Sequence, residues 1–457
     1  MGARLALEAA AARLVGRLSR AAGRGGGTTL PGKLLWKLDP AALDALAARL
    51  QATAVISATN GKTTTCAMAA RIMGRSRRLA WNSSGANLAS GVASTLLAVR
   101  DAELGLLEVD EFALPELARR LRPRVVCLGN LFRDQLDRYG ELEYIAERWR
   151  GLIAALPGET TLVVNADDPL VAHLATRRER VLRFGLEDRS SARPALQHAA
   201  DSKYCVRCGG PYGYAAAYVG HLGEYRCPAC GHERPPLDIT ARGIELDGLE
   251  GSSFELSTPA GSTRIRLALP GLYNIYNALA AAALAIALDA SLDDVDAGLS
   301  GFRAAFGRFE RIDAGDKRIL MLLIKNPAGA NEAVRTLEEG GVPPTLIVAL
   351  NDAIADGRDV SWIWDVDFEP LLDNAERIVV SGDRAAELAL RFTYAGFPDE
   401  RLEVIPSLEE ALDRGLALIP SGGELGVLPT YTAMLGLRAI IARRGLVRPF
   451  WQMEATA

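Results

Sequence analysis

Histidine is scarce in this chain, which has only four among 457 residues. They are His173, His198, His221 and His232, and two of them lie in or beside a cysteine-rich segment. Serine and cysteine nucleophiles are usually activated by a neighbouring base, most often histidine. The sequence therefore offers no obvious Cys–His or Ser–His pair of its own.

Long apolar runs and an excess of one charge are missing as well. No apolar stretch reaches the roughly 20 residues that a membrane-spanning helix needs, and no signal peptide opens the chain. The formal net charge is only −4, so bulk electrostatics does not favour a nucleic-acid partner. These absences predict a cytoplasmic protein. A basic amphipathic helix over residues 4–20 could lie on the inner face of the membrane, although packing on its own domain is commoner.

Cysteine is also rare, with six residues. Four of them form two Cys-x2-Cys pairs, whereas Cys66 and Cys127 stand alone. The paired residues are Cys205, Cys208, Cys227 and Cys230. This spacing is not a disulfide framework. Four thiolates suit tetrahedral Zn²⁺ and leave no position for water, so the sequence predicts a structural zinc site in an inserted ribbon over about 200–236.

Apolar strand candidates alternate with helical stretches along most of the chain. They are 52–56, 104–109, 125–128 and 161–164, then 319–324, 345–350, 377–380 and 425–428. Such alternation predicts an α/β fold with parallel sheets. Residues 237–268 look like antiparallel strands. We expect two domains, 1–311 and 312–457, because the length is too great for one.

A turn rich in glycine and threonine follows the first strand candidate. It reads Ser57-Ala58-Thr59-Asn60-Gly61-Lys62-Thr63-Thr64-Thr65. In a P-loop, Gly61 would let backbone N–H groups approach phosphates, Lys62 would reach the terminal phosphates, and Thr63 would bind Mg²⁺. The full Walker pattern has glycine where this chain has Ile56. The prediction of an ATP site therefore depends on the strand–turn–helix context.

Two acidic segments follow strand candidates. Glu108-Val109-Asp110-Glu111 lies at the end of the strand candidate 104–109, where carboxylates suit Mg²⁺, and Glu108 is the best candidate ligand. The second segment, 351–359, contains Asp352, Asp356 and Asp359 and follows the strand 345–350. Each could instead be a solvated acidic turn.

Several motifs together resemble the Mur ligase superfamily, which includes folylpolyglutamate synthases. They are the P-loop, Asn82-Ser83-Ser84-Gly85-Ala86-Asn87, Asn274-Ile275-Tyr276-Asn277-Ala278, Phe306-Gly307-Arg308-Phe309-Glu310-Arg311 and Lys325-Asn326-Pro327. The resemblance implies a central P-loop ATPase domain followed by a Rossmann-like α/β C-terminal domain. It implies that the nucleotide is bound by Asn60, Gly61, Lys62, Thr63, Thr64, Asn274 and Arg308, with Mg²⁺ at Thr63 and Glu108.

Further segments resemble a narrower family, the Mur ligase-like subunits of lipid II isoglutaminyl synthases. They are the cysteine ribbon, residues 356–365 and residues 430–435. This resemblance implies ATP-dependent amidation of the D-glutamate α-carboxylate of lipid II to D-isoglutamine, through an acyl phosphate. The ammonia would come from a class I glutaminase partner of the GatD type. The alternatives are an amino-acid-adding ligase of the Mur or folylpolyglutamate type and a non-enzymatic nucleotide-binding scaffold.

In this family an aspartate of the third domain is thought to complete the Cys–His pair of the glutaminase. The resemblance places that residue in the segment 351–359. We favour Asp356 as the catalytic residue, with Asp352 next and Asp359 third. The expected cofactors are thus ATP, Mg²⁺ and a structural Zn²⁺.

Overall fold

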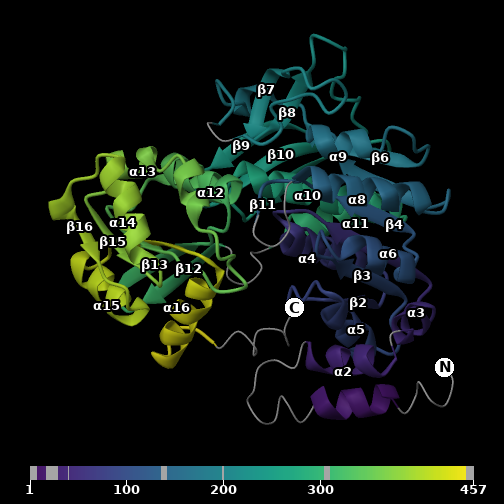
Figure 1. Ribbon diagram of the computed structural model, residues 1–457, viewed down its shortest axis with the longest axis horizontal. Helices are drawn as coiled ribbons and strands as arrows, with labels where there is room; N and C mark the ends of the chain where they lie inside the picture. Colours follow the sequence, from purple (N-terminus) through teal and green to yellow (C-terminus); the bar gives the residue numbers. More distant parts are fainter. Residues whose placement is uncertain are drawn as a thin grey trace.

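A computed structural model describes residues 8–16, 29–39, 41–134, 142–197, 200–302 and 309–448. It contains two large sheets of mainly parallel strands, each with helices on both faces, and the sheets lie side by side (Figure 1). The predicted α/β class is confirmed. Arg308 lies outside the described residues.

The first sheet has nine strands in the order β11-β10-β9-β6-β5-β4-β1-β3-β2. Their bounds are β1 Ala52–Ser57, β2 Leu79–Trp81, β3 Leu104–Glu108, β4 Val125–Leu128, β5 Thr161–Asn165, β6 Val181–Leu186, β9 Ile239–Asp247, β10 Gly251–Thr258 and β11 Gly261–Leu267. From β2 to β9 the neighbours pair in parallel, so their carboxyl ends share one edge. The predicted antiparallel strands are present as β9 to β11, and they extend the same sheet.

Helices cover both faces of this sheet because its central strands are apolar on both sides. In β1, Ala54 and Ile56 belong to one core and Val55 to the other. One face carries α4 Lys62–Met73, α10 Leu272–Ala287 and α11 Leu292–Leu299. The other carries α2 Leu30–Leu38, α3 Ala42–Ala47, α5 Ala89–Ala98, α6 Leu114–Leu121, α8 Leu142–Ala155 and α9 Pro169–Leu174.

The cysteine ribbon is inserted between β6 and β9. After a short helical turn, η1 Arg189–Ser191, it forms a separate two-stranded sheet of β7 Gly213–Val219 and β8 Leu222–Arg226. The two strands run antiparallel. This sheet lies within the predicted segment 200–236 and stands at the top of the molecule in Figure 1.

The second sheet has six strands in the order β12-β13-β17-β14-β15-β16. Its strands are β12 Phe309–Ala314, β13 Lys317–Leu322, β14 Thr345–Ala349, β15 Arg377–Ser381, β16 Leu402–Val404 and β17 Glu424–Pro429. One face carries α12 Pro327–Gly340, η2 Ser361–Asp365, α13 Glu369–Asn374 and α14 Ala385–Tyr394; the other carries α15 Leu408–Leu418 and α16 Tyr431–Arg443, and η3 is Asp399–Arg401. Only β12 is antiparallel to its neighbour. The boundary that we propose at residue 311 falls within β12.

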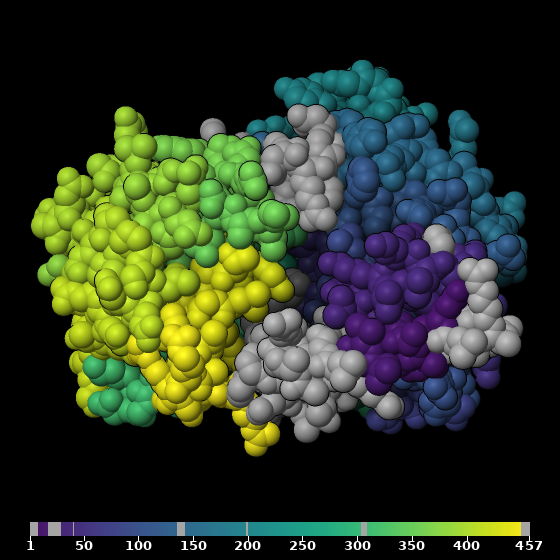
Figure 2. Space-filling view, turned by 60° about the horizontal axis from the view of Figure 1, so that its bottom comes forward, coloured from purple at the N-terminus to yellow at the C-terminus, as the bar shows by residue number. Residues whose placement is uncertain are grey.

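Residues 8–16 of the predicted basic helix are helical and pack on their own domain. Ala9 and Ala12 are buried in the same core as α2 and α5. Figure 2 shows these N-terminal helices in purple, with the second sheet's domain in green and yellow on the opposite side. Among the described residues, no helix is both long enough and apolar enough to cross a membrane.

Candidate active site and cysteine ribbon

The predicted P-loop joins β1 to α4 at the carboxyl edge of the first sheet. Gly61 has a φ of 86°, a conformation that glycine adopts without strain. The loop is fixed from β4, because the N–H of Asn60 donates to Asn130 Oδ1 at 2.9 Å and Asn130 Nδ2 donates to the Asn60 carbonyl at 3.1 Å. The sequence motifs did not single out Asn130 as a site residue, although its place just beyond an apolar strand could have indicated such a role.

Lys62 begins α4 and is only 7% exposed. Its ammonium donates to Glu111 Oε2 at 2.8 Å, to the Thr59 carbonyl at 3.2 Å and to the Ala58 carbonyl. Glu111 is held in turn by Trp149, whose Nε1–H donates to the Glu111 carbonyl at 2.9 Å. The ammonium thus lies at the P-loop, where a phosphate would compete with Glu111 for it.

Thr63 and Glu108, the two predicted magnesium ligands, converge on the backbone of Gly85. A Cβ added to Gly85 would lie 3.4 Å from Thr63 Oγ1 and 3.8 Å from Glu108 Oε2. Glu108 is buried at the end of β3, and its Oε1 accepts from Asn87 Nδ2 at 3.1 Å. Asn82 pairs with both backbone groups of Glu108 at 2.8 Å. A hydroxyl and a carboxylate oxygen close to the same glycine are ligand types that suit Mg²⁺.

Helix α10 lies directly against the P-loop through Asn277, which is bonded to Asn274. Asn277 Nδ2 donates to Asn274 Oδ1 at 3.1 Å, and Thr65 Oγ1 donates to Asn277 Oδ1 at 3.3 Å. A Cβ at Gly61 would lie 1.9 Å from Asn277 Oδ1, so no larger residue fits there without a shift. Asn274 itself donates to the Pro270 carbonyl at 2.8 Å. Asn277 therefore limits the space next to Gly61, and Asn274 fixes the side chain of Asn277.

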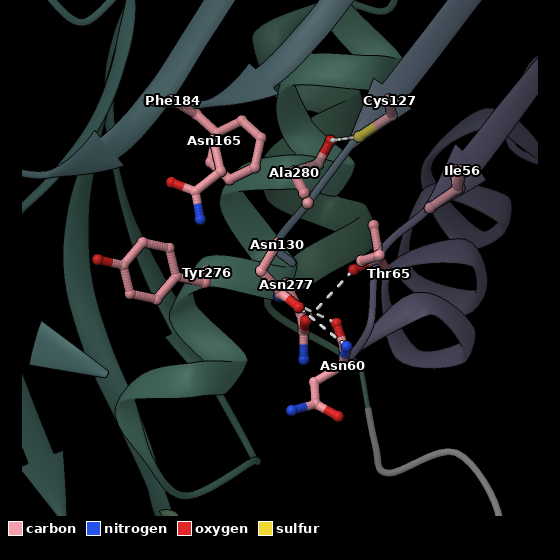
Figure 3. Close-up of a pocket in the computed structure, with 12 residues that line it drawn as sticks. Ile56, Asn60, Thr65, Cys127, Asn130, Asn165, Phe184, Tyr276, Asn277 and Ala280 are labelled. Atoms are coloured by element: carbon pink, nitrogen blue, oxygen red, sulfur yellow. Dashed lines mark hydrogen bonds between the residues drawn. The ribbon is translucent and has the colours of Figure 1, made fainter. Parts of the chain in front are cut away.

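A small pocket opens between the P-loop, the ends of β4 and β5, and α10 (Figure 3). Its lining is Ile56, Ala58, Asn60, Thr65, Cys127, Gly129, Asn130, Asn165, Phe184, Tyr276, Asn277 and Ala280. Amide side chains face apolar and aromatic side chains across it. Its volume of about 10 Å³ has room for about one water molecule and is too small for the base or sugar of a nucleotide.

The second sheet's domain contributes to the same site. Asn326, the N-cap of α12, exchanges two side-chain hydrogen bonds with Asn60, at 3.1 and 3.0 Å. Lys325 forms an ion pair with Asp134, which follows β4. Asn60 and Asn326, which belong to two of the predicted motifs, are 266 positions apart in the sequence. The P-loop and the C-terminal domain thus meet at the edge where phosphates are expected.

Asp356 lies in the loop after β14, and it is 6% exposed. Its Oδ1 accepts from the N–H of Thr432 at 2.8 Å, and its Oδ2 accepts from the Thr432 hydroxyl. Burial raises the pKa of Asp356 above its ordinary value, although the donors of Thr432 oppose the rise. Thr432 belongs to the first turn of α16, where the helix dipole also favours an anion.

The other two acids of this loop are more accessible. Asp352 is half-buried, with an oxygen 3.7 Å from Arg384 Nε. Asp359 is exposed, and hydrogen bonds from the hydroxyl and N–H of Ser361 lower its pKa. The three candidates thus share one loop but differ in burial and in partners.

The four ribbon thiols form one cluster, with all sulfurs within 4.8 Å of one another. Cys205 and Cys230 lie 3.6 Å apart, and Cys208 and Cys227 lie 3.5 Å apart. A tetrahedron with Zn–S bonds of about 2.3 Å has edges of about 3.8 Å. The cluster therefore fits a tetrahedral metal ion with four sulfur ligands.

The two Cys-x2-Cys turns have the same backbone pattern. Cys205 N–H donates to the Gly210 carbonyl at 2.7 Å, and Gly209 N–H donates to the Cys205 carbonyl at 2.8 Å. The second turn repeats these bonds from Cys227 at 2.7 and 2.9 Å, and Gly209 and Gly231 both have a φ of 73°. Burial opposes ionisation of Cys205, but N–H donors, led by Arg207, lower the pKa of its thiol to about 6. Thiolates are the form that binds metal.

The two lone cysteines are buried in the core behind the P-loop. Burial raises the pKa of Cys66 well above its ordinary value and that of Cys127 to about 12. A thiol without access or ionisation is a poor nucleophile. Their position therefore indicates packing and not catalysis.

Comparisons with known proteins agree with this geometry. Residues 56–226 match the Mur ligase middle domain, and residues 323–434 match the MurT ligase C-terminal domain. The lipid II isoglutaminyl synthase (glutamine-hydrolyzing) subunit MurT of Streptococcus pneumoniae R6 is 35% identical, over 93% of this chain and 94% of that protein. The protein of the same name from Staphylococcus aureus N315 is 31% identical, over 84% and 86%.

Among solved structures, MurF from Acinetobacter baumannii superposes with a TM-score of 0.66 at 21% identity, over 91% of this chain and 80% of that one. That likeness supports the fold alone. The two MurT proteins are more than 30% identical to this chain over at least 84% of its length, which supports the family as well as the fold. The chain belongs to the MurT family of ATP-dependent Mur ligases, the subunits of glutamine-hydrolysing lipid II isoglutaminyl synthases.

Proposed function

We propose that this chain uses ATP to activate the D-glutamate α-carboxylate of lipid II and then amidates it with ammonia, in peptidoglycan biosynthesis. The observation that supports this most is the meeting of three elements at one edge: the P-loop with Lys62, the Thr63–Glu108 pair, and Asn326 from the C-terminal domain. Mur-type chemistry needs a nucleotide and an acceptor held between these two domains. Family membership supplies the nature of the acceptor.

In the first step, the acceptor carboxylate attacks the γ-phosphorus of ATP, and the bond to the β-phosphate oxygen breaks, which gives an acyl phosphate and ADP. Lys62 would exchange Glu111 for the phosphate and stabilise its developing charge. Thr63 and Glu108 would hold Mg²⁺, which would supply charge neutralisation at the phosphates. Asn60, Gly61, Thr64, Asn274 and Arg308 are the remaining residues that we propose for nucleotide binding.

In the second step, ammonia attacks the acyl carbon, phosphate leaves, and a proton is released from nitrogen. The amide of D-isoglutamine results. The ammonia would come from a GatD-type glutaminase, which hydrolyses glutamine to glutamate. We propose that Asp356 accepts a hydrogen bond from the partner's catalytic histidine and fixes its orientation. Asp352 and Asp359, in the same loop, are the alternatives.

We propose Zn²⁺ as the metal of the cysteine ribbon, in a structural role. Its four thiolates would fill every position of a tetrahedral ion, so no water could be activated there. Metal analysis of the purified chain should give one zinc per chain, lost on Cys208→Ser. A wild-type zinc content in Cys208→Ser would contradict the site. Since the proposed acceptor is lipid-linked, we expect the chain to work at the cytoplasmic face of the membrane.

Co-expression with a class I glutaminase, followed by mass spectrometry of lipid II, tests the proposed reaction. Replacement of one hydroxyl by an amino group in the stem peptide, dependent on ATP and glutamine, is the expected result. An acceptor extended by an amino acid would instead indicate the amino-acid-adding alternative. Unchanged lipid II in every condition would reject both.

A further inference from the structure

A buried carboxylate outside the proposed catalytic machinery connects the ribbon to α10, the helix that lies against the P-loop. Asp167, between β5 and α9, is 0% exposed. It accepts from Arg234 Nη1 at 2.9 Å, from the Tyr276 hydroxyl at 2.6 Å and from the Leu186 N–H at 2.9 Å. A Cβ at Gly185 would lie 2.5 Å from Asp167 Oδ1, so the carboxylate approaches the backbone closely. Arg234 belongs to the ribbon and Tyr276 to α10.

Tyr276 lies beside the residues that shape the P-loop. Its ring lines the pocket of Figure 3 next to Asn277. Asn277 in turn accepts from Thr65 and limits the space at Gly61. A movement of Tyr276 would therefore carry Asn277 with it, because both belong to one rigid turn of helix.

The ribbon segment also contacts a helix of the C-terminal domain. Arg335, in α12, donates from Nη1 to the Tyr218 carbonyl at 2.9 Å and from Nη2 to the Ser191 carbonyl at 3.2 Å. Nearby, Arg193 Nη2 lies 3.5 Å from Glu332 Oε1. Figure 1 shows β7 and β8 above both α10 and α12. The ribbon thus contacts the two helices that approach the P-loop from either domain.

Helix α12 contacts two separate parts of the molecule, the P-loop at its N-terminus and the ribbon farther along the helix. Its N-cap, Asn326, bonds to Asn60 of the P-loop, and Arg335 bonds to the ribbon. A helix transmits a displacement along its axis because its backbone is rigid. A closed ring of contacts therefore joins the P-loop, α12, the ribbon and α10.

We infer that the cysteine ribbon positions α10 and α12 around the nucleotide, with Asp167, Arg234 and Arg335 as positioning residues. The inference rests on the nucleotide site proposed above. It gives the ribbon a part in ATP binding, beyond stabilising its own segment. Removal of one of these contacts weakens nucleotide binding more than it slows turnover.

The test compares Tyr276→Phe and Arg335→Met with matched changes on the outer side of the ribbon. Tyr204→Phe and Arg226→Met are suitable controls, since Tyr204 is 67% exposed and the Arg226 side chain is 73% exposed. Calorimetry on the full zinc-loaded chain measures the Kd for ADP, and the complex with a glutaminase gives the KM for ATP and kcat. Each test variant should raise both binding constants about 3- to 10-fold. The controls should match the wild type.

Arg335→Lys should restore part of the affinity, and the double variant should lose less than the product of the two single losses, because both break one ring. Wild-type Kd and KM in folded Tyr276→Phe would overturn the inference, whatever the stability of Arg335→Met. A fall in kcat alone would overturn it too. ADP binding requires neither acceptor nor glutaminase, so a failure of amidation would reject the proposed function without changing this result.

Discussion

Two acidic loops follow parallel strands in the two sheets, and their carboxylates have different kinds of partner. After β3, the carboxylate of Glu111 is neutralised by the Lys62 ammonium at 2.8 Å. After β14, Asp356 receives hydrogen bonds from the N–H and hydroxyl of Thr432. Within the described residues, no ion pair joins Asp356 to a cation.

This difference indicates what each loop can offer. The ammonium of Lys62 is already buried and paired, so exchanging Glu111 for a phosphate costs little further desolvation. A buried cation needs a partner of opposite charge in either state. An aspartate fixed by neutral donors retains its negative charge for a group from outside. An imidazolium of a second protein is such a group. The first loop is therefore suited to substrate and the second to a partner.

The largest effect is expected from Asp356→Asn, which removes the negative charge of Asp356 from the second loop and leaves the first loop unchanged. The amide keeps the shape but does not stabilise an imidazolium, so glutaminase activity of the complex should fall by roughly 10⁴-fold. The Kd for ADP should stay unchanged. Glutamate release and calorimetry measure the two quantities.

Asp352→Asn and Asp359→Asn are the matched controls for that variant. We expect both to retain most of the glutaminase activity. Full activity in Asp356→Asn, with a large loss in either control, would move the catalytic assignment to that other acid.

Lys62→Met breaks the first loop. Amidation should fall by at least roughly 10³-fold, because the phosphate loses its charge-stabilising group. Glutamine hydrolysis by the partner should persist. Burial of Glu111 without its cation should also cost about 3–5 kcal/mol of stability. Amidation close to wild type would contradict the role of Lys62.

Two further variants separate activity from stability here. Lys62→Met combined with Glu111→Gln should recover the unfolding temperature but not amidation, because the uncompensated charge is gone. Lys37→Met removes an exposed lysine of α2 and should change neither quantity. Thermal denaturation and lipid II mass spectrometry report the two effects.

Local patterns in the sequence predict one loop better than the other. The P-loop, its strand and its helix are contiguous, and the ribbon cysteines are set by spacing within two short turns, so both could be expected from the sequence. The contact between Asn60 and Asn326 could not, because it depends on how two sheets meet. The link from Asp167 to Arg234 spans 67 positions and leaves no periodic signal. The proposed role of Asp356 depends on a second chain, which this sequence does not contain.

Asn326→Ser tests the contact between the two domains. Serine can still cap α12 by accepting from the Gly329 N–H, as Asn326 does at 2.9 Å. It cannot form both bonds to Asn60. We therefore expect a rise of about 3- to 10-fold in the KM for ATP, with unchanged helix stability. An unchanged KM would show that the pair does not contribute to nucleotide binding.

The smallest expected effect distinguishes the two loops by pH. Burial raises the pKa of Asp356 in the folded chain, so its proton is retained to a higher pH than that of an ordinary aspartate near 4. Glutaminase activity requires the ionised form, and it should therefore rise with pH through this raised value. By the same linkage, stability from the protonated form is lost as pH rises through it.

Thr432→Val removes a hydroxyl that lowers the pKa of Asp356, so the acid limb of the glutaminase profile should move to higher pH. The shift should be less than about one unit, since one hydrogen bond is lost. Thr393→Val, at an exposed threonine that contacts Asp399, is the matched control and should leave the profile in place. The KM for ATP should not follow the same shift, because Lys62 and Glu111 lie in the other sheet's loop. An acid limb identical in Thr432→Val and wild type would indicate that Asp356 is a structural residue, and the contrast between the two loops would then be one of packing alone.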